Sequence, residues 1–366
     1  MKFRIERAAL LRVLGHVQSV VERRNTIPIL SNVMIQAGDS SATLTTTDLD
    51  IQATETVPVE VAQSGATTVP AQTFNDIIRK MPDGCQIELT ADSDKLTLVS
   101  GRSRFTLAVL PADDFPLIPS EKLPNTFALP SETLSTLFNR ARYAISNEET
   151  RYYLNGIFLH TDEESILAVS TDGHRLARIQ APRPAAINDI AGVIIPRKCI
   201  GEILKVVDDT DDDVQIGLSE TKISFKLGEL TYTSKLIDGT YPDYVRVIPT
   251  GNQRNVIVDP RALAETIDRV SMISAERTRA VKVNLDRDQL KLSVTSPETG
   301  LATESLDVDY SGDPFEIGFN ARYLLDALQQ NKDGLIELSM NNPSDPILVI
   351  AQNRKEDVSV LMPMRT

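Results

Sequence analysis

The segment Thr171-Asp172-Gly173-His174-Arg175 holds the residues of this chain whose types and spacing come closest to a catalytic group. An aspartate two residues before a histidine could act as an acid–base pair. The sequence contains no motif that would place a serine or cysteine nucleophile beside this pair, and no glycine-rich phosphate loop. A structural turn is therefore the preferred interpretation. An enzyme that uses Asp172 and His174 remains the alternative.

Metal chemistry is not expected from the histidines and cysteines. The three histidines, His16, His160 and His174, lack the spacing of metal ligands, and the two cysteines are too few for a cysteine-based zinc site. Cys85 and Cys199 lie 114 residues apart, and a disulfide between them is not expected in a reducing cytosol. We expect no metal and no cofactor, and the sequence leaves the roles of the two cysteines open.

Length and composition indicate a globular protein of two or three domains. The chain has 366 residues, of which 41% are hydrophobic and 24% charged. Its apolar runs are too short for a membrane-spanning helix. Residues 1–7 alternate charged and apolar side chains and do not resemble a secretory signal. We therefore expect a cytoplasmic protein with no membrane partner.

Two sets of amphipathic helices recur along the chain. Apolar residues at positions i, i+4, i+7 and i+10 repeat at offsets of 124 and then 129 residues. A second helix in each repeat recurs at offsets of 126 and 124 residues, and in the first two repeats it follows a proline. The first set comprises Leu10, Leu14, Val17, Val20; Leu134, Phe138, Ala141, Ala144; and Leu263, Ile267, Val270, Ile273. The second set comprises Phe74, Ile77, Ile78; Ile200, Ile203, Leu204; and Leu324, Ala327, Leu328.

Strand patterns with a period of two separate these helices, for example at residues 43–47, 95–99, 223–227 and 289–294. Each repeat is thus predicted to be an α+β unit of about 120 residues with two helices and antiparallel sheets. The predicted domains are 1–120, 126–248 and 253–366, separated by polar, proline-containing stretches at 119–125 and 249–255. The repeat indicates either gene duplication without special geometry or a rotationally symmetric arrangement.

The charge is distributed unevenly between the helices and the rest of the chain. The net charge is −13, but the six helix windows 7–24, 72–80, 131–142, 197–207, 260–270 and 320–332 together carry +8, which leaves −21 elsewhere. Helix propensity alone predicts no such bias, because Glu forms helices as well as Lys or Arg does. A basic helical face would attract a polyanion weakly, with salt sensitivity and without sequence preference.

Four motifs make the chain resemble the bacterial DNA polymerase III β subunit family along its whole length. The motifs are Arg151-Tyr152-Tyr153-Leu154-Asn155-Gly156, Thr171-Asp172-Gly173-His174-Arg175-Leu176, Tyr241-Pro242-Asp243-Tyr244 with Arg246-Val247, and Met362-Pro363-Met364-Arg365. The resemblance implies three clamp domains per chain and a head-to-tail homodimer that forms a six-domain ring. It also implies a sliding clamp that encircles double-stranded DNA without catalysing a reaction. Its partners would be the polymerase III alpha subunit, the clamp-loader delta subunit, and other polymerases and repair proteins that dock through short linear peptides.

The same resemblance assigns roles to individual residues. The peptide groove would comprise Leu154, Thr171, Gly173, His174, Arg175, Leu176, Pro242, Arg246, Val247, Asn320, Tyr323, Val360, Met362, Pro363, Met364 and Arg365. DNA would be contacted by Arg24, Arg79, Tyr152, Tyr153, Arg197, Lys198 and Lys205. The dimer interface would contain Arg102, Arg104, Phe105, Met272, Ile273, Glu298 and Glu304.

Some positions depart from the family pattern. Gln72 stands where the family often has arginine, and the loop 147–149 is unusually acidic, so weaker contact with DNA is expected there. Residues 299–301 are uncharged, so the acidic side of the predicted interface has fewer carboxylates than the family pattern. Ser344 and Pro346 lie in a variable loop and are not assigned to the groove. A non-ring scaffold of three α+β units that binds proteins remains the second alternative.

Overall fold

The computed structural model describes residues 1–22, 24–119, 121–185, 187, 189–190, 192–274 and 280–365. Ser120, the expected end of the first domain, lies outside the described residues. The chain divides into two compact units. Unit 1 comprises Met1–Ser135, Pro184–Asn188 and Lys198–Leu236, and unit 2 comprises Thr136–Arg183, Asp189–Arg197 and Ile237–Thr366.

The six predicted helices are confirmed. They are α1 (Arg7–Val17), α2 (Ala71–Lys80), α3 (Ser131–Ala141), α4 (Arg197–Val207), α5 (Pro260–Ser271) and α6 (Ala321–Gln329). Short 3-10 turns also occur, namely η1 (Gln18–Val20), η2 (Pro28–Ser31), η3 (Ala112–Asp114), η4 (Arg142–Ala144), η5 (Glu149–Leu154) and η6 (Tyr244–Val247). The periodic apolar residues behind the prediction are buried, and only Ile77 and Ile273 are partly exposed.

Side-chain caps fix the starts of two helices in the third repeat. The Oδ1 atom of Asp259 accepts hydrogen bonds from the backbone N–H groups of Arg261 and Ala262 at the start of α5. Asn320 accepts in the same way at the start of α6. Such caps satisfy amide groups that have no partner inside the helix. The entry points of these helices are therefore set by local sequence.

Unit 1 contains a five-stranded and an eight-stranded antiparallel sheet within the described residues. The first has the order β5 (Glu60–Gln63), β1 (Lys2–Glu6), β7 (Gln86–Ala91), β8 (Lys95–Ser100), β9 (Ser103–Ala108). The second has the order β10 (Asn125–Pro130), β15 (Asp213–Leu218), β16 (Lys222–Leu227), β17 (Leu230–Lys235), β4 (Ile51–Pro58), β3 (Ser41–Thr47), β2 (Asn32–Gly38), β6 (Gly65–Pro70).

Unit 2 likewise contains an eight-stranded and a four-stranded sheet in the part of the chain that is described. The first has the order β14 (Val193–Pro196), β11 (Gly156–Thr161), β12 (Ser165–Thr171), β13 (Arg175–Pro182), β25 (Arg354–Leu361), β24 (Ile347–Ala351), β23 (Ile336–Met340), β18 (Arg254–Val258). The second has the order β21 (Gly300–Asp307), β20 (Gln289–Ser296), β19 (Ala280–Asp286), β22 (Phe315–Asn320). The four strand segments predicted from sequence lie inside β3, β8, β16 and β20.

Both eight-stranded sheets run across the expected boundaries between repeats. In unit 1, β4 of the first repeat pairs with β17 of the second, with Ala53 opposite Tyr232. In unit 2, β13 of the second repeat pairs with β25 of the third, with Leu176 opposite Val360. Backbone ladders therefore join successive repeats, and the strands of the second repeat are shared between the two units.

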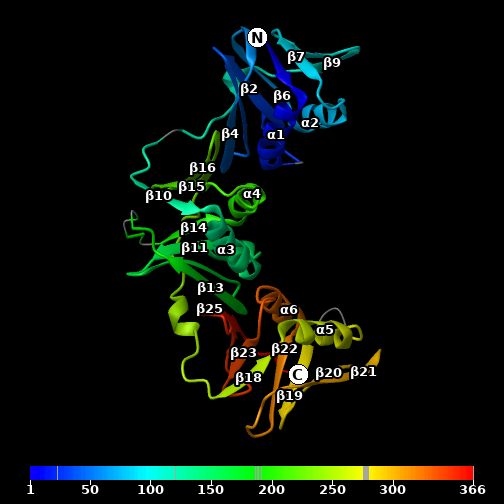
Figure 1. Ribbon diagram of the computed structural model, residues 1–366, viewed down its shortest axis with the longest axis vertical. Helices are drawn as coiled ribbons and strands as arrows, with labels where there is room; N and C mark the ends of the chain where they lie inside the picture. Colours follow the sequence, from blue (N-terminus) through cyan, green and yellow to red (C-terminus); the bar gives the residue numbers. More distant parts are fainter. Residues whose placement is uncertain are drawn as a thin grey trace. The chain divides into compact units, whose positions relative to one another are not determined.

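Helices from the same repeat lie side by side over the sheets. Figure 1 shows α1 beside α2 and α5 beside α6, and their residues are in contact. In unit 2, α5 and α6 bury Leu263, Ile267 and Leu324 against strands β19 to β22. The helix faces that point away from these cores carry the polar side chains. In the described part of the chain, no helix is both long enough and apolar enough to span a membrane.

Removing a large side chain from the core of the first repeat should destabilise unit 1. Phe74 on α2 is fully buried, so Phe74→Ala should lower the free energy of unfolding by about 3–5 kcal/mol through lost burial and the cavity left behind. Thr73→Ala, at the adjacent exposed position, should change it by less than about 0.5 kcal/mol. Thermal and denaturant unfolding would measure both. Equal effects of the two substitutions would contradict this packing.

Candidate functional site

A hollow of about 340 Å³ lies in unit 2 where strands β13 and β25 meet. Nine residues of the predicted groove line it, namely Leu154, Thr171, Gly173, Arg175, Leu176, Pro242, Val247, Val360 and Met362. The sequence therefore identified most of the lining, although these residues come from segments more than 200 positions apart. We call this hollow the groove.

The inner wall of the groove is apolar and closely packed. Leu154, Leu176 and Val360 belong to a buried cluster that also includes Tyr241 and Tyr244. The register of the sheet places Leu176 directly opposite Val360, so both side chains share one face. Such a slot binds apolar side chains by removing them from water.

A tight turn between β12 and β13 forms one rim of the groove. Oδ1 of Asp172 accepts hydrogen bonds from the backbone N–H groups of His174 and Arg175, at 2.9 and 3.0 Å, and Oδ2 accepts one from Nε of Arg175 at 3.1 Å. The Asp172 carboxylate is thus engaged in the turn. The imidazole of His174 stacks on the ring of Tyr323, with centroids 6.0 Å apart. This geometry favours the structural turn over the acid–base pair.

Gly173 keeps this rim close to the side chain of Arg151. Its φ of +87° is a left-handed conformation that favours glycine, and an added Cβ would lie 2.6 Å from Nη1 of Arg151. Arg151 is held by two hydrogen bonds to Glu148 and by one to the carbonyl of Asp172. The hydrogen bonds to Glu148 raise the pKa of the guanidinium above its usual value.

The other predicted groove residues lie outside this hollow. Pro363, Met364 and Arg365 line a second hollow of about 550 Å³, together with Glu316, Ile317, Gly318, Pro343 and Ser344. Asn320 caps α6, next to Tyr323. The exposed guanidinium of Arg246 bonds to Asp243 at 2.7 Å.

Four residues that the resemblance does not assign to the groove also line it, namely Arg151, Tyr153, Asp243 and Tyr244. All four lie inside the motifs that carried the family resemblance, so adjacency within a motif could have identified them. Tyr153 was assigned to DNA contact instead. Ser344, in the loop that departs from the family pattern, lines the second hollow although the resemblance does not assign it to the groove.

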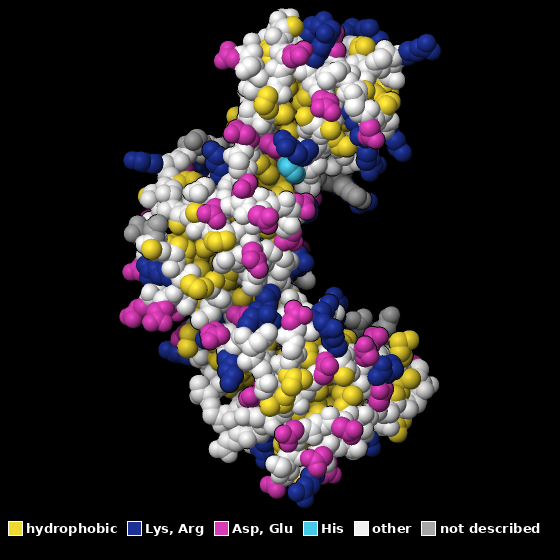
Figure 2. Space-filling view, in the orientation of Figure 1, with side chains coloured by type: hydrophobic (Ala, Val, Ile, Leu, Met, Phe, Trp, Pro, Cys, Tyr) yellow, Lys and Arg dark blue, Asp and Glu magenta, His cyan; other side chains and the backbone are white. Residues whose placement is uncertain are grey.

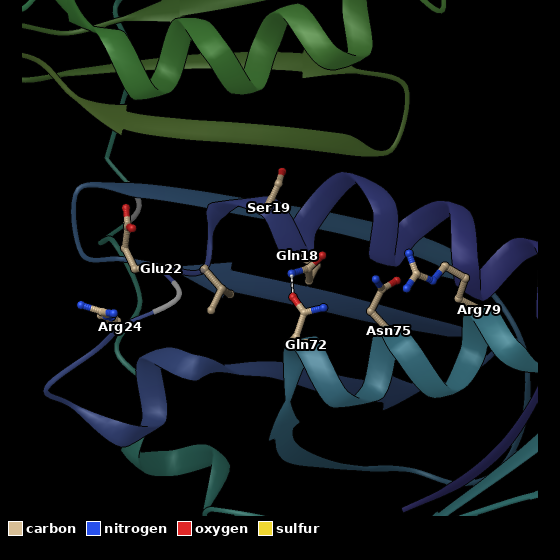
Figure 3. A pocket seen from close by; sticks show the side chains of 8 residues that line it. Gln18, Ser19, Glu22, Arg24, Gln72, Asn75 and Arg79 are labelled. Atoms are coloured by element: carbon tan, nitrogen blue, oxygen red, sulfur yellow. Dashed lines mark hydrogen bonds between the residues drawn. The ribbon is translucent and has the colours of Figure 1, made fainter.

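In unit 1, Arg24 and Arg79 line a hollow of about 690 Å³ with polar walls. Figure 3 shows Gln72, Asn75 and Arg79 along one face of α2, with Gln18 of η1 facing Gln72 and Arg24 at the opposite end of the row from Arg79. Nε2 of Gln18 donates to Oε1 of Gln72 at 2.7 Å. The arginines thus flank a row of amide groups, which suits hydrogen bonding to phosphate oxygens. Glu22 also lines this hollow, and Nη2 of Arg79 donates to Asp76 at 3.2 Å, so the cationic character of the hollow is reduced.

The lysines predicted to contact DNA have carboxylate partners within unit 1. Nζ of Lys198 donates to the carbonyl of Val20 at 2.9 Å, to Asp48 at 2.6 Å and to Glu22. Burial acts to lower the pKa of Lys198, but these two carboxylates outweigh it and raise the pKa. Nζ of Lys205 donates to Glu202 at 2.7 Å.

The remaining residues predicted to contact DNA lie in unit 2. The Arg197 guanidinium donates to the carbonyls of Ile145 and Ser146, and burial lowers its pKa. Tyr152 is exposed and makes an edge-to-face contact with Tyr153 at a centroid distance of 5.9 Å. On the face in view in Figure 2, Lys and Arg side chains are interspersed with Asp and Glu.

The predicted interface residues lie at or near the outer strands of two sheets. Arg102, Arg104 and Phe105 are exposed on β9 and the turn before it, at one edge of the five-stranded sheet. In unit 2, Met272 is 80% exposed after α5, and Ile273 is partly buried against the core of the third repeat. Glu298 is exposed in the turn before β21, an outer strand of the four-stranded sheet.

Glu304 on β21 already has a partner in its own chain. Its carboxylate accepts hydrogen bonds from Nε and Nη2 of Arg269, the shortest at 2.6 Å. These bonds lower the pKa of Glu304 below its usual value. Among the described residues there is also no cluster of three or more His, Cys, Asp and Glu side chains that could hold a metal ion.

Comparison with known families accounts for almost the whole chain. The three domains of the DNA polymerase III beta subunit family match the chain in order: the N-terminal domain at residues 1–119, the central domain at 128–243 and the C-terminal domain at 245–365. Beta sliding clamps from Caulobacter vibrioides and Escherichia coli are 45% and 35% identical, and each comparison covers both chains completely.

Solved structures agree with these matches. A sliding clamp from Bartonella birtlesii bound to griselimycin is 45% identical, with a TM-score of 0.97 over the full length of both chains. A Caulobacter crescentus beta sliding clamp with polyethylene glycol at its putative beta-motif tethering region is 44% identical, with a TM-score of 0.96. That comparison covers all of this chain and 99% of the other.

The stability of unit 2 should depend on the protonation of His160. Nε2 of His160 lies 2.9 Å from the hydroxyl oxygen of Tyr244, and burial lowers the pKa of His160 below its usual value. Below pH about 6.5 the unfolded chain therefore binds more protons at this site, and stability falls as the pH is lowered. Between pH 7 and 5.5, the free energy of unfolding should fall less steeply for His160→Gln than for the wild type. Parallel curves would refute this role for His160.

Proposed function

Because the chain belongs to the DNA polymerase III beta subunit family, it is a DNA sliding clamp without catalytic activity, and we propose that two copies close head to tail into a ring around duplex DNA. The family does not favour the two alternatives left open by the sequence, an enzyme using Asp172 and His174 and a non-ring scaffold. The repeats matched at 1–119, 128–243 and 245–365 support our division into domains 1–120, 126–248 and 253–366.

The edges of two sheets support closure of the ring. β9 in the first repeat and β21 in the third are outer strands, and each leaves one edge without a partner strand within the described chain. Phe105 on β9, Met272 after α5 and Leu301 on β21 are large apolar side chains exposed to solvent. Exposed edges of this kind invite pairing with another chain. Pairing of β9 with β21 of a second copy would continue a sheet from subunit to subunit, as β4·β17 and β13·β25 continue sheets between repeats.

Charge complementarity supports the same pairing. Arg102 and Arg104 lie at β9, and Glu298 lies beside β21. We propose Glu298 as the main acidic partner of these arginines. Glu304 would contribute less, because Arg269 of its own chain already binds its carboxylate.

The clamp acts on DNA and on a polymerase, and we propose that topology rather than tight contact retains it. A net charge of −13 disfavours strong binding to DNA. Arg24 and Arg79, with the amides between them, would contact phosphates weakly, and Tyr152 would stack or hydrogen-bond at the inner surface. Arg79, Lys198, Lys205 and Arg197 would contribute less than free cations, because each already bonds to acceptors in its own unit.

The groove in unit 2 would tether client proteins through short linear peptides. Its apolar wall would hold apolar side chains of a peptide, while Met362 adapts to different shapes. The polymerase III alpha subunit, the clamp-loader delta subunit and other polymerases and repair proteins would use it in turn. A tethered polymerase experiences a high effective concentration of primer terminus, so modest peptide affinity is sufficient. We place this activity in the cytoplasm, where bacterial chromosomes are replicated.

Substitution of a residue at the groove's mouth tests the peptide site. Val247 lines the groove, whereas Val245, on the same short helix η6, is exposed and does not. Val247→Asp should weaken binding of griselimycin at least tenfold, because a carboxylate would be desolvated against an apolar wall. Val245→Asp should leave the affinity within twofold. Isothermal titration calorimetry of both variants would decide, and equal losses would exclude the groove as the site.

Retention on circular and linear DNA tests the ring. The protein would be loaded onto nicked circular plasmid with a clamp loader and ATP, and half of the sample would then be linearised. Retention on circles and loss from linear ends at moderate salt is the expected result. Leu301→Asp should abolish retention and convert dimers to monomers in sedimentation equilibrium, because a charge would face β9 of the partner subunit. Equal loss from both DNA forms by the wild type would reject ring closure.

A further inference from the structure

The guanidinium of Arg175 lies at the centre of a cluster of four side chains in unit 2. Nη1 donates to Oδ2 of Asp326 at 2.6 Å, and Nε donates to Asp172 at 3.1 Å. Its carbon atom Cζ lies 4.5 Å from the ring centroid of Tyr323 and 5.3 Å from that of Tyr143. The Arg175 side chain is only 10% exposed.

This cluster fixes both the charge and the orientation of Arg175. Burial disfavours the charged form, but the hydrogen bond to Asp326 and the charge of Asp172 outweigh it and raise the pKa of Arg175. A planar guanidinium held by two carboxylates and two ring faces has little freedom to rotate. The hydroxyl of Tyr143 donates to Ser359 on β25 at 2.8 Å, and burial raises the pKa of Tyr143 to about 12. The cluster therefore connects η4, β13, β25 and α6.

The first repeat contains the same turn without this cluster. Strands β3 and β4 lie 124 positions before β12 and β13, and Leu49 has a φ of +81° where Gly173 has +87°. Asp48 accepts hydrogen bonds from the N–H groups of Asp50 and Ile51, as Asp172 does from those of His174 and Arg175. Ile51 thus occupies the position of Arg175.

The sheet also crosses the repeat boundary at both places. β4 pairs with β17 where β13 pairs with β25, and Lys235 N donates to the carbonyl of Asp50 as Met362 N donates to that of His174. Neither the turn nor the pairing of the repeats therefore requires an arginine at this position. What Arg175 does in addition is to line the groove.

We propose that Asp326 on α6 is a positioning residue for peptide binding, which holds Arg175 in the orientation that forms the groove wall. Asp326 is not among the residues that line the groove. Asp172 also binds Arg175, but it organises the turn as well, so Asp326 is the partner that can be altered with the turn left intact. Through Asp326, the affinity of a groove formed mainly by the second repeat depends on a helix of the third. This inference rests on the proposed peptide groove.

Substitution of Asp326 in the full-length chain tests the proposal, with griselimycin as the probe in isothermal titration calorimetry. Asp326→Asn removes the charge that orients Arg175 and should weaken binding about five- to tenfold at 25 °C. Asp326→Glu should restore affinity to within about threefold of the wild type. In an Arg175→Ile background, which copies Ile51 of the first repeat, Asp326→Asn should have no further effect on affinity.

Asp357→Asn provides the matched structural control. Asp357 pairs with Arg140 in unit 2, and neither residue lines the groove. This substitution should lower the unfolding temperature but leave the affinity within twofold. Equal losses in Asp326→Asn and Asp357→Asn, or additive effects of Asp326→Asn and Arg175→Ile, would overturn the positioning role. If Val247→Asp also fails to weaken griselimycin binding, the groove is not the binding site. If Val247→Asp weakens it and Asp326→Asn does not, only the role of Asp326 is wrong.

Discussion

The pairing of backbone strands across the repeat boundaries is the constraint on which the rest of the structure depends. β4·β17 and β13·β25 are antiparallel ladders whose hydrogen bonds involve backbone groups, so they tolerate very different side chains. Because the side-chain period of a strand is two, each ladder also fixes which residues face the core. The ladder between β13 and β25 thereby places Leu176 beside Val360, and the groove is a direct consequence of this register.

The two junctions between repeats have similar backbones but carry different side chains. The turns at 47–51 and 171–175 share their aspartate caps and their left-handed residue. At the first turn the left-handed position carries Leu49 and the strand begins with Ile51. At the second, Gly173 leaves room for Arg151, and Arg175 brings a charge that needs carboxylate partners. The hollow at the second junction thus results from a few side chains placed on a repeated backbone.

Several of the basic side chains on the helices of this clamp form ion pairs with nearby carboxylates. Lys198, Lys205 and Arg269, all on or beside helices, have carboxylate partners within their own unit. Such pairs reduce the field that a basic helix face projects into solvent, and salt screens what remains. Weak attraction to DNA is consistent with sliding, because a clamp held by tight contacts would not move along the duplex.

The sequence by itself determined the repeat, the six helices and most of the groove lining, because these depend on local periodicity, turn residues and short motifs. Helix windows such as 197–207 were predicted to the residue, since the proline before the helix and its apolar spacing are local signals. Some charged pairs are local, such as Lys205 with Glu202 three residues away, but only the tertiary structure decided the long-range partners of charged side chains. Arg175 and Asp326 are 151 positions apart, and Glu304 meets Arg269 only because β21 packs against α5. No local pattern encodes such contacts, because they arise only when the sheets bring distant segments together.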